Sequence, residues 1–165
     1  MSAERHPKIR GERTCLRPAS EDDLDLLTGW HADPDVYEWW DHRALSSDEV
    51  AEKYVGRRSP GVESFIVEAD GRSIGFLQYW LGDPGQAGLD MFLVPDARHR
   101  GLGPDAARAV VRYLIDERGM GRVTVDPRVD NARAIRAWRK VGFVEEKEFD
   151  GEDGRALLMV IEADR

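Results

Sequence analysis

The chain has 165 residues, of which 41% are hydrophobic and 34% charged, and its formal net charge is −8. This length and composition are typical of one globular domain with its own core, and the acidic balance argues against a protein that binds nucleic acid through a basic surface. The single cysteine, Cys15, excludes a disulfide within the chain and is not expected to act as a nucleophile.

No internal repeat or low-complexity linker divides the chain. We therefore expect one domain over residues 1–165, with residues 1–12 as a flexible or edge segment. Residues 1–10 contain no apolar stretch of the signal-peptide type, and no run approaches the roughly 18 apolar residues of a membrane span. These features predict a cytoplasmic protein whose partners include neither a membrane nor a nucleic acid.

The N-terminal third is predicted to contain one strand and two helices. Residues 13–18 form the strand, which ends at a proline. Helices are predicted over 20–31 and 46–55, because each begins with a serine and an acidic residue at capping-box spacing. Residues 33–41 interrupt the helical pattern, so we expect an irregular segment between the two helices.

The middle of the chain has the pattern of a β-hairpin followed by a third strand. Residues 64–69 and 73–81 are apolar runs joined by the turn residues Asp70 and Gly71. A loop is expected over 82–88 and a strand over 89–94.

The C-terminal half is predicted to contain two helices, one strand and a second hairpin. The first helix has Pro104 at its first position, and the second runs over 131–141 and ends at Gly142. A strand over 123–126 lies between the helices, and residues 143–161 form the hairpin. The element order β-α-α-β-β-β-α-β-α-β-β predicts a mixed sheet with helices on both faces.

The glycine-containing loop over 95–104 has three open interpretations. It is a plain connection whose glycines permit a turn, a dinucleotide-binding loop, or a pyrophosphate site. The GxGxxA pattern that starts at Gly101 fits a dinucleotide site poorly, because its first glycine does not directly follow the strand. A pyrophosphate site would use backbone N–H groups, the helix N-terminus and the charges of Arg98 and Arg100.

Two segments of the sequence resemble the GNAT superfamily of N-acetyltransferases. The run Arg98-His99-Arg100-Gly101-Leu102-Gly103 resembles its (R/Q)-x-x-G-x-(G/A) acyl-CoA motif, and residues 126–143 resemble its second coenzyme A segment. Residues 16–40 and 88–90 are similar to the aminoglycoside 6′-N-acetyltransferase branch. The resemblance implies the GNAT fold, an α/β (α+β) fold with a central mixed, mostly antiparallel sheet and helices on both faces.

The resemblance also implies acetyl-CoA as the acyl donor and no metal, and the four histidines show no metal-ligand spacing. It assigns the thioester to the backbone N–H groups of Phe92 and Val94, and pantetheine to Asn131. From the residues alone, Asn131 could instead cap the following helix, and His99 could be a solvated loop residue. The implied coenzyme-binding residues are Phe92, Val94, Arg98, His99, Arg100, Gly101, Leu102, Gly103, Pro104 and Asn131.

Transfer of an acetyl group to an amine requires a neutral amine and a polarised thioester carbonyl. Asp90, at a strand that leads into the glycine loop, and Asp126, at the end of the next strand, are the predicted catalytic residues. The alternatives are a strand-end carboxylate that bonds nearby backbone for Asp90, and a turn-forming aspartate before proline for Asp126.

The family often has a tyrosine that protonates the leaving thiolate, and Trp138 stands at that position. Because an indole N–H has no useful acidity, we expect Trp138 to pack on Phe143 instead. Water, Tyr79, Tyr113 or another group would then supply the proton.

The predicted acceptor-binding residues are Trp39, Trp40, Asp41, Asp90 and Asp126. Aromatic faces and carboxylates suit a cationic sugar, although one of the two tryptophans is expected in the core. We therefore predict direct transfer to a primary amine of a cationic small molecule, of the aminoglycoside 6′-amine type. The alternatives are an acyltransferase for a lysine side chain, a polyamine or a protein N-terminus, and a non-catalytic acyl-CoA-binding module. The chain is expected to be a monomer or a homodimer.

Overall fold

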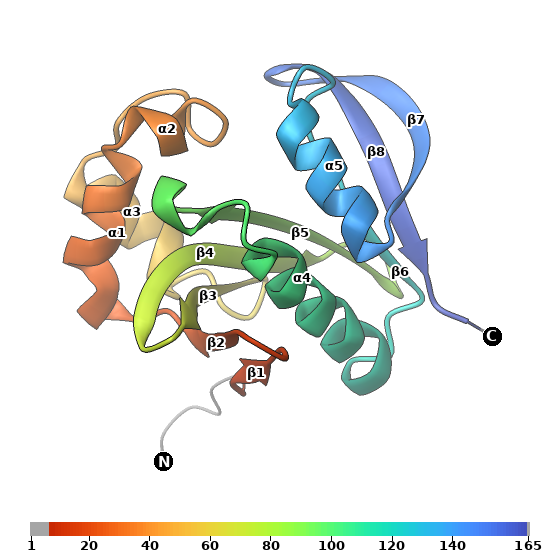
Figure 1. The fold of residues 1–165 in the computed structure, drawn as a ribbon, viewed down its shortest axis with the longest axis horizontal. Helices are drawn as coiled ribbons and strands as arrows, with labels where there is room; N and C mark the ends of the chain where they lie inside the picture. Colours follow the sequence, from red (N-terminus) through yellow and green to blue (C-terminus); the bar gives the residue numbers. More distant parts are fainter. Residues whose placement is uncertain (1–6, 165) are drawn as a thin grey trace.

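A computed structural model describes residues 7–164. Its centre is an eight-stranded sheet with the strand order β1-β2-β3-β4-β5-β6-β8-β7 (Figure 1). All neighbouring strands are antiparallel except β5 and β6, which are parallel. The strands are β1 (Ile9–Arg10), β2 (Cys15–Pro18), β3 (Val62–Ala69), β4 (Arg72–Leu81), β5 (Gln86–Leu93), β6 (Arg122–Val125), β7 (Val144–Gly151) and β8 (Gly154–Glu162).

Helices cover both faces of this sheet, as predicted. Phe65, Leu77 and Tyr79 are buried on the face that carries α4 and α5, whereas Ile66 and Phe76 are buried beneath α1 and α3. Among residues 7–164, no helix is both long and apolar enough to cross a bilayer. The helical elements are α1 (Leu24–His31), α2 (Pro34–Tyr37), α3 (Ser47–Tyr54), α4 (Leu102–Arg112) and α5 (Ala132–Val141), with short 3-10 turns at η1 (Glu21–Asp23) and η2 (Pro95–Ala97) and a π-helical turn at η3 (Tyr113–Glu117).

Most boundaries follow the sequence signals, and both predicted capping boxes are present. Two boundaries were wrong. β5 starts at Gln86, because residues 86–88 pair with β6 rather than forming a loop. α4 begins at Leu102 instead of Pro104, and its first turn tolerates the proline because the N–H groups there have no partner within the helix.

Two further segments differ from the expectation in smaller ways. The interval over 33–41 contains the single-turn helix α2, whose N-cap Asp33 accepts a hydrogen bond from the Asp35 N–H. Of the N-terminal segment expected to be flexible or at an edge, residues 7–12 contain the edge strand β1, and residues 1–6 lie outside the described part of the chain.

A fork in the sheet between β5 and β6 positions the site. The two strands pair only from Gln86 to Gly88 and from Arg122 to Thr124, and β5 then continues to Leu93 without a partner on that side. The open side of the fork leaves room beside Asp90 on β5 and places Asp126 directly after β6. β5 and β6 therefore splay apart beyond Gly88 and Thr124.

Candidate active site

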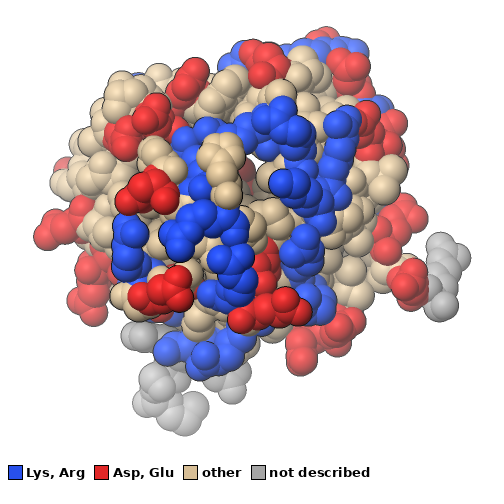
Figure 2. Space-filling view, viewed as in Figure 1, with Lys and Arg blue, Asp and Glu red and all other residues tan. Residues whose placement is uncertain are grey.

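A cleft of about 490 Å³ lies at this fork, between the end of β5, the start of α4, α5 and the β7–β8 turn. Its mouth is the hollow that Figure 2 shows among basic side chains. Four predicted site residues do not line it: Asp41, Val94, Arg100 and Leu102. Those that do are Trp39, Trp40, Asp90, Phe92, Arg98, His99, Gly101, Gly103, Pro104, Asp126 and Asn131.

The glycine loop has the geometry of an anion site. Gly101 is the N-cap of α4 and has a φ of 76°, in the left-handed region that glycine adopts without steric cost. The first-turn N–H groups of a helix have no partner within it, and the helix dipole adds partial positive charge. Backbone donors and positive potential therefore meet at the cleft wall that Gly101 and Gly103 form.

The side chains of this loop contribute less than predicted. Leu102 is 2% exposed and belongs to the core, so only its backbone can contribute to the site. The Arg100 side chain is exposed outside the cleft. Arg98 lines the cleft, but its guanidinium donates to the carbonyls of Leu93 (3.0 Å) and Asp35 (3.0 Å), so it also holds the end of β5 against α2.

The expected free N–H of Val94 is a wrong prediction. This N–H donates to the carbonyl of Ile74 on β4, at 2.9 Å. Because N–H groups alternate sides along a strand, that of Phe92 also faces β4, and the groups on the open side of the fork belong to Met91 and Leu93. The N–H groups of β5 that face the cleft are thus each shifted by one residue from the predicted ones.

Asp90 lines the cleft beside the open edge of β5. One carboxylate oxygen accepts the Met91 N–H at 3.0 Å. Burial, the nearby charge of Asp126 and the smaller effect of Asp41 raise the pKa of Asp90 to about 8, although the Met91 N–H acts in the opposite direction. Such a carboxyl is a stronger base than an ordinary aspartate, and an entering cation would favour its ionised form.

Asp126 is the second acid of the cleft. The residue is exposed at the end of β6, yet the surrounding protein atoms still restrict water around the carboxylate and raise its pKa. Two carboxyls with raised pKa values in one cleft are typical of sites that handle protons.

Trp39 and Trp40 have different surroundings. Trp40 donates from its indole nitrogen to the Tyr54 hydroxyl at 2.9 Å and packs edge-on against Phe92. It is half-buried against the core and also lines the cleft, so the expected core position is met only in part. Trp39 lines the cleft, and its ring centroid lies 5.4 Å from the Arg128 guanidinium carbon. Trp39 therefore contributes an aromatic ring to the cleft wall.

Asp41 is not in the position predicted for a substrate ligand. One oxygen accepts from the Tyr54 hydroxyl at 2.9 Å, and the other lies 3.0 Å from Nδ1 of the fully buried His31. The carboxylate thus supports the wall behind Trp40 and does not line the cleft.

The rim of the cleft carries additional acidic groups. Asp35 lies on α2, and Glu152 and Asp153 form the β7–β8 turn. Nε2 of His42 lies 3.3 Å from the Asp153 carboxylate, which links the segment after α2 to this turn. Acidic side chains therefore lie along part of the cleft wall, although Arg128 also lines it beside Trp39.

A comparison with known protein families shows which family the chain belongs to. Residues 19–151 match the family model described as an acetyltransferase (GNAT) domain. The chain belongs to the GNAT acetyltransferase family. This confirms the predicted family, and the eight-stranded mixed sheet confirms the predicted fold.

Relatives of known structure and function support the same class of enzyme. The aminoglycoside N(6′)-acetyltransferase type 1 of Klebsiella pneumoniae is 29% identical over 90% of this chain and 83% of that protein. A crystal structure of the aminoglycoside acetyltransferase AAC(6′)-Ib in complex with coenzyme A and kanamycin matches with a TM-score of 0.83 and 29% identity, over 90% of this chain and 94% of that chain. The predicted enzyme class, an acetyl-CoA-dependent N-acetyltransferase, is confirmed.

More distant members share the fold alone. The spermidine N-acetyltransferase of Vibrio cholerae, solved with CoA and spermine, has a TM-score of 0.79 at 19% identity and covers 91% of this chain and 95% of that chain.

This GNAT chain has tryptophan where the family often has a tyrosine. Trp138 is 6% exposed, and its ring centroid lies 5.5 Å from that of Phe143, as predicted. Of the alternative proton donors, Tyr79 is fully buried and its hydroxyl accepts from Arg118, and Tyr113 does not line the cleft. No tyrosine lines the cleft within residues 7–164, so neither Tyr79 nor Tyr113 is placed there to protonate the thiolate.

Sequence reasoning missed the basic side chains of α5. Arg133, Arg136 and Lys140 line the cleft from one face of this helix, near the basic loop before α4. Their spacing of three and four residues was a visible signal of a common face. Among the described residues, no group of three or more His, Cys, Asp or Glu side chains could hold a metal ion.

Proposed function

We propose that this N-acetyltransferase acetylates a primary amine of a polycationic small molecule of the aminoglycoside type, at its 6′-amine. The observation that carries the proposal is the pair of raised-pKa carboxyls, Asp90 and Asp126, on the two arms of the fork. The acidic side chains along the cleft and the ring of Trp39 in its wall support it, and so do the names of the relatives at 29% identity.

In the proposed mechanism, the basic loop and α5 bind the diphosphate of acetyl-CoA, and the thioester lies in the fork. Asp90, directly or through water, takes one proton from the substrate ammonium. The neutral amine attacks the thioester carbonyl, whose oxygen faces the Leu93 N–H. The tetrahedral intermediate expels the thiolate, and its nitrogen loses one of its two protons to solvent, so that the amide keeps one N–H. The thiolate takes a proton from solvent, and Asp90 returns to solvent the proton that it accepted. The products are the N-acetyl amine, the coenzyme thiol and one released proton.

Asn131 has two roles in this proposal. Its side-chain oxygen accepts the Ala134 N–H at 3.2 Å and so caps α5. Asn131 also lines the cleft, and its amide nitrogen, which the cap does not use, would donate to a pantetheine carbonyl. Capping and binding are thus compatible.

A panel of acceptors tests the substrate class. Release of coenzyme thiol from acetyl-CoA is followed with kanamycin-type aminoglycosides, spermidine, a lysine peptide and no acceptor. We expect the largest kcat/KM with the aminoglycosides, and mass spectrometry should show one acetyl group on the 6′-amine. A higher kcat/KM with the lysine peptide or with spermidine would contradict the proposed acceptor but leave the acetyltransferase assignment intact.

Trp39→Ala tests the acceptor surface. We expect the acceptor KM to rise by about tenfold, because a stacked aromatic contact contributes up to about 1.5 kcal/mol, while the acetyl-CoA KM stays unchanged. Trp39→Phe keeps an aromatic face and should recover most of the affinity. Equal acceptor KM values for the alanine variant and the parent enzyme would remove Trp39 from the site.

A further inference from the structure

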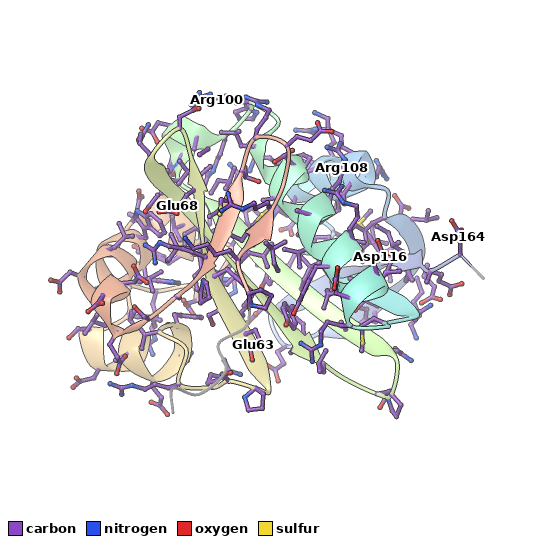
Figure 3. The ribbon with its side chains drawn as sticks, turned by 90° about the horizontal axis from the view of Figure 1, so that it is seen from below. Glu63, Glu68, Arg100, Arg108, Asp116 and Asp164 are labelled. Carbon is purple, nitrogen blue, oxygen red and sulfur yellow. The ribbon has the colours of Figure 1, made fainter. Side chains whose placement is uncertain are left out.

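The N-terminal hairpin contacts the glycine loop through one arginine. Nη1 of Arg13, in the turn between β1 and β2, donates to the Arg100 carbonyl at 2.7 Å. The same nitrogen would lie 3.4 Å from a Cβ added to Gly101. Figure 3 shows Arg100 at the rim where this hairpin meets the start of α4. Arg13 does not itself line the cleft.

Asp105, in the first turn of α4, holds this turn in place. Its buried carboxylate accepts the N–H groups of Glu12 and Arg13, each at 3.1 Å, and the Thr14 hydroxyl at 2.7 Å. A Cβ at Gly11 would lie 2.3 Å from the Asp105 carboxylate, so only glycine permits this close approach. Burial acts to raise the pKa of Asp105, but these hydrogen bonds together lower it, so the carboxylate stays ionised.

The Arg13 contact sets the orientation of one peptide group. In a trans peptide the carbonyl oxygen and the following N–H point in opposite directions. Because the Arg100 carbonyl points to Arg13, the Gly101 N–H points away from Arg13, and Gly101 lies on the cleft wall. A left-handed glycine has several accessible peptide orientations, so an external bond is needed to select one.

We propose that Arg13 and Asp105 are positioning residues that hold the glycine loop in its anion-binding conformation. This inference rests on the proposed binding of the coenzyme's diphosphate by this loop. Arg13 acts through the Arg100 carbonyl rather than as a phosphate ligand. Preorganisation of the loop lowers the free-energy cost of ordering it when the diphosphate binds.

The test compares Arg13→Ala with Arg10→Ala, which removes an exposed arginine from the same hairpin without this contact. Binding of coenzyme A is measured by calorimetry, and turnover is measured with two donors, acetyl-CoA and S-acetylpantetheine, which lacks the diphosphate. For Arg13→Ala we expect the coenzyme A Kd and the acetyl-CoA KM to rise about tenfold, the scale of one lost oriented hydrogen bond, with little change in kcat. With S-acetylpantetheine, kcat/KM should match that of the parent enzyme.

Gly11→Ala provides an independent perturbation, because it displaces Asp105 from the turn and leaves the Arg13 side chain intact. It should raise the coenzyme A Kd in the same direction. An unchanged Kd for Arg13→Ala, an equal loss in Arg10→Ala, or an equal loss with the donor that lacks the diphosphate would each overturn the inference. If Gly101→Val also binds coenzyme A normally, the proposed role of the loop fails as well. If only Gly101→Val loses affinity, the positioning role alone is wrong.

Discussion

Asp90→Asn is expected to slow turnover by about 10²-fold or more, the usual scale for loss of a general base. Asparagine keeps the size of the side chain and an oxygen that can accept the Met91 N–H, so the fork and the coenzyme site should be preserved. Acetyl-CoA should therefore bind with unchanged affinity in calorimetry. Steady-state turnover that equals the parent value would remove Asp90 from the mechanism.

The pH dependence gives a second measurement of the same group. Because Asp90 must be ionised to accept a proton and its pKa is raised to about 8, kcat/KM should rise with pH through this region and fall on acidification. In Asp90→Asn this ascending limb should disappear. Asp116→Asn, on the exposed π-helical turn η3, is the control: it changes the net charge by the same amount but lies away from the cleft, so it should keep the pH profile of the parent enzyme.

The raised pKa of Asp90 also affects how the stability of the fold depends on pH. The direction is opposite to that of an ordinary ion-paired aspartate, whose pKa is lowered on folding. Between the unfolded value of 3.8 and the folded value of about 8, the folded protein binds more protons at Asp90 than the unfolded chain. Its contribution therefore becomes less favourable as pH rises through this window. The Tm of Asp90→Asn relative to the parent should accordingly be higher at pH 8 than at pH 5.

Gly101→Val is expected to abolish measurable acetyl-CoA binding and leave a folded protein. The φ of 76° is strongly unfavourable for a β-branched residue, at a cost of about 1–2 kcal/mol or more. The added Cβ also lies beside the Arg13 guanidinium, at 3.4 Å. The loop would relax to a negative φ and turn its N–H groups away from the diphosphate. Calorimetry with coenzyme A, together with circular dichroism, measures both outcomes.

Gly71→Val is the matched control for this substitution. Gly71 has a φ of 75° in the β3–β4 turn, nearly the same conformation as Gly101, and a Cβ there meets nothing within 4 Å. The two variants should lose similar stability, but Gly71→Val should still bind coenzyme A. If both variants bind it as the parent does, the diphosphate does not lie on the glycine loop.

The sequence predicted the elements of the fold well where local signals are strong. Both capping boxes and the hairpin turns depend on residues close together in the chain, so their signals survive in a single sequence. The start of β5 was wrong because residues 86–88 become a strand only by pairing with β6, more than thirty residues away. Long-range pairing of this kind leaves no local periodicity.

The candidate site was predicted in part, mainly through the family motifs. Asp90, Asp126 and the glycine loop lie together as expected. The prediction of which β5 residues have N–H groups facing the cleft was wrong by one residue. The register with β4 decides which alternate residues face β4 and which face the cleft, and the sequence does not reveal that register. The prediction that Asp41 binds the acceptor was wrong, because its buried partners, His31 and Tyr54, lie on helices whose orientation the sequence does not reveal.

The fork between β5 and β6 has an energetic consequence for the donor. On the open edge of β5, the Met91 N–H already donates to the Asp90 carboxylate, and the Leu93 carbonyl already accepts from the Arg98 guanidinium. A pantetheine arm therefore replaces hydrogen bonds that already exist with these side chains or with solvent. Such an exchange contributes little net free energy. Most of the affinity for the coenzyme must then come from its charged end, and the thioester end can be held loosely enough for the product thiol to leave.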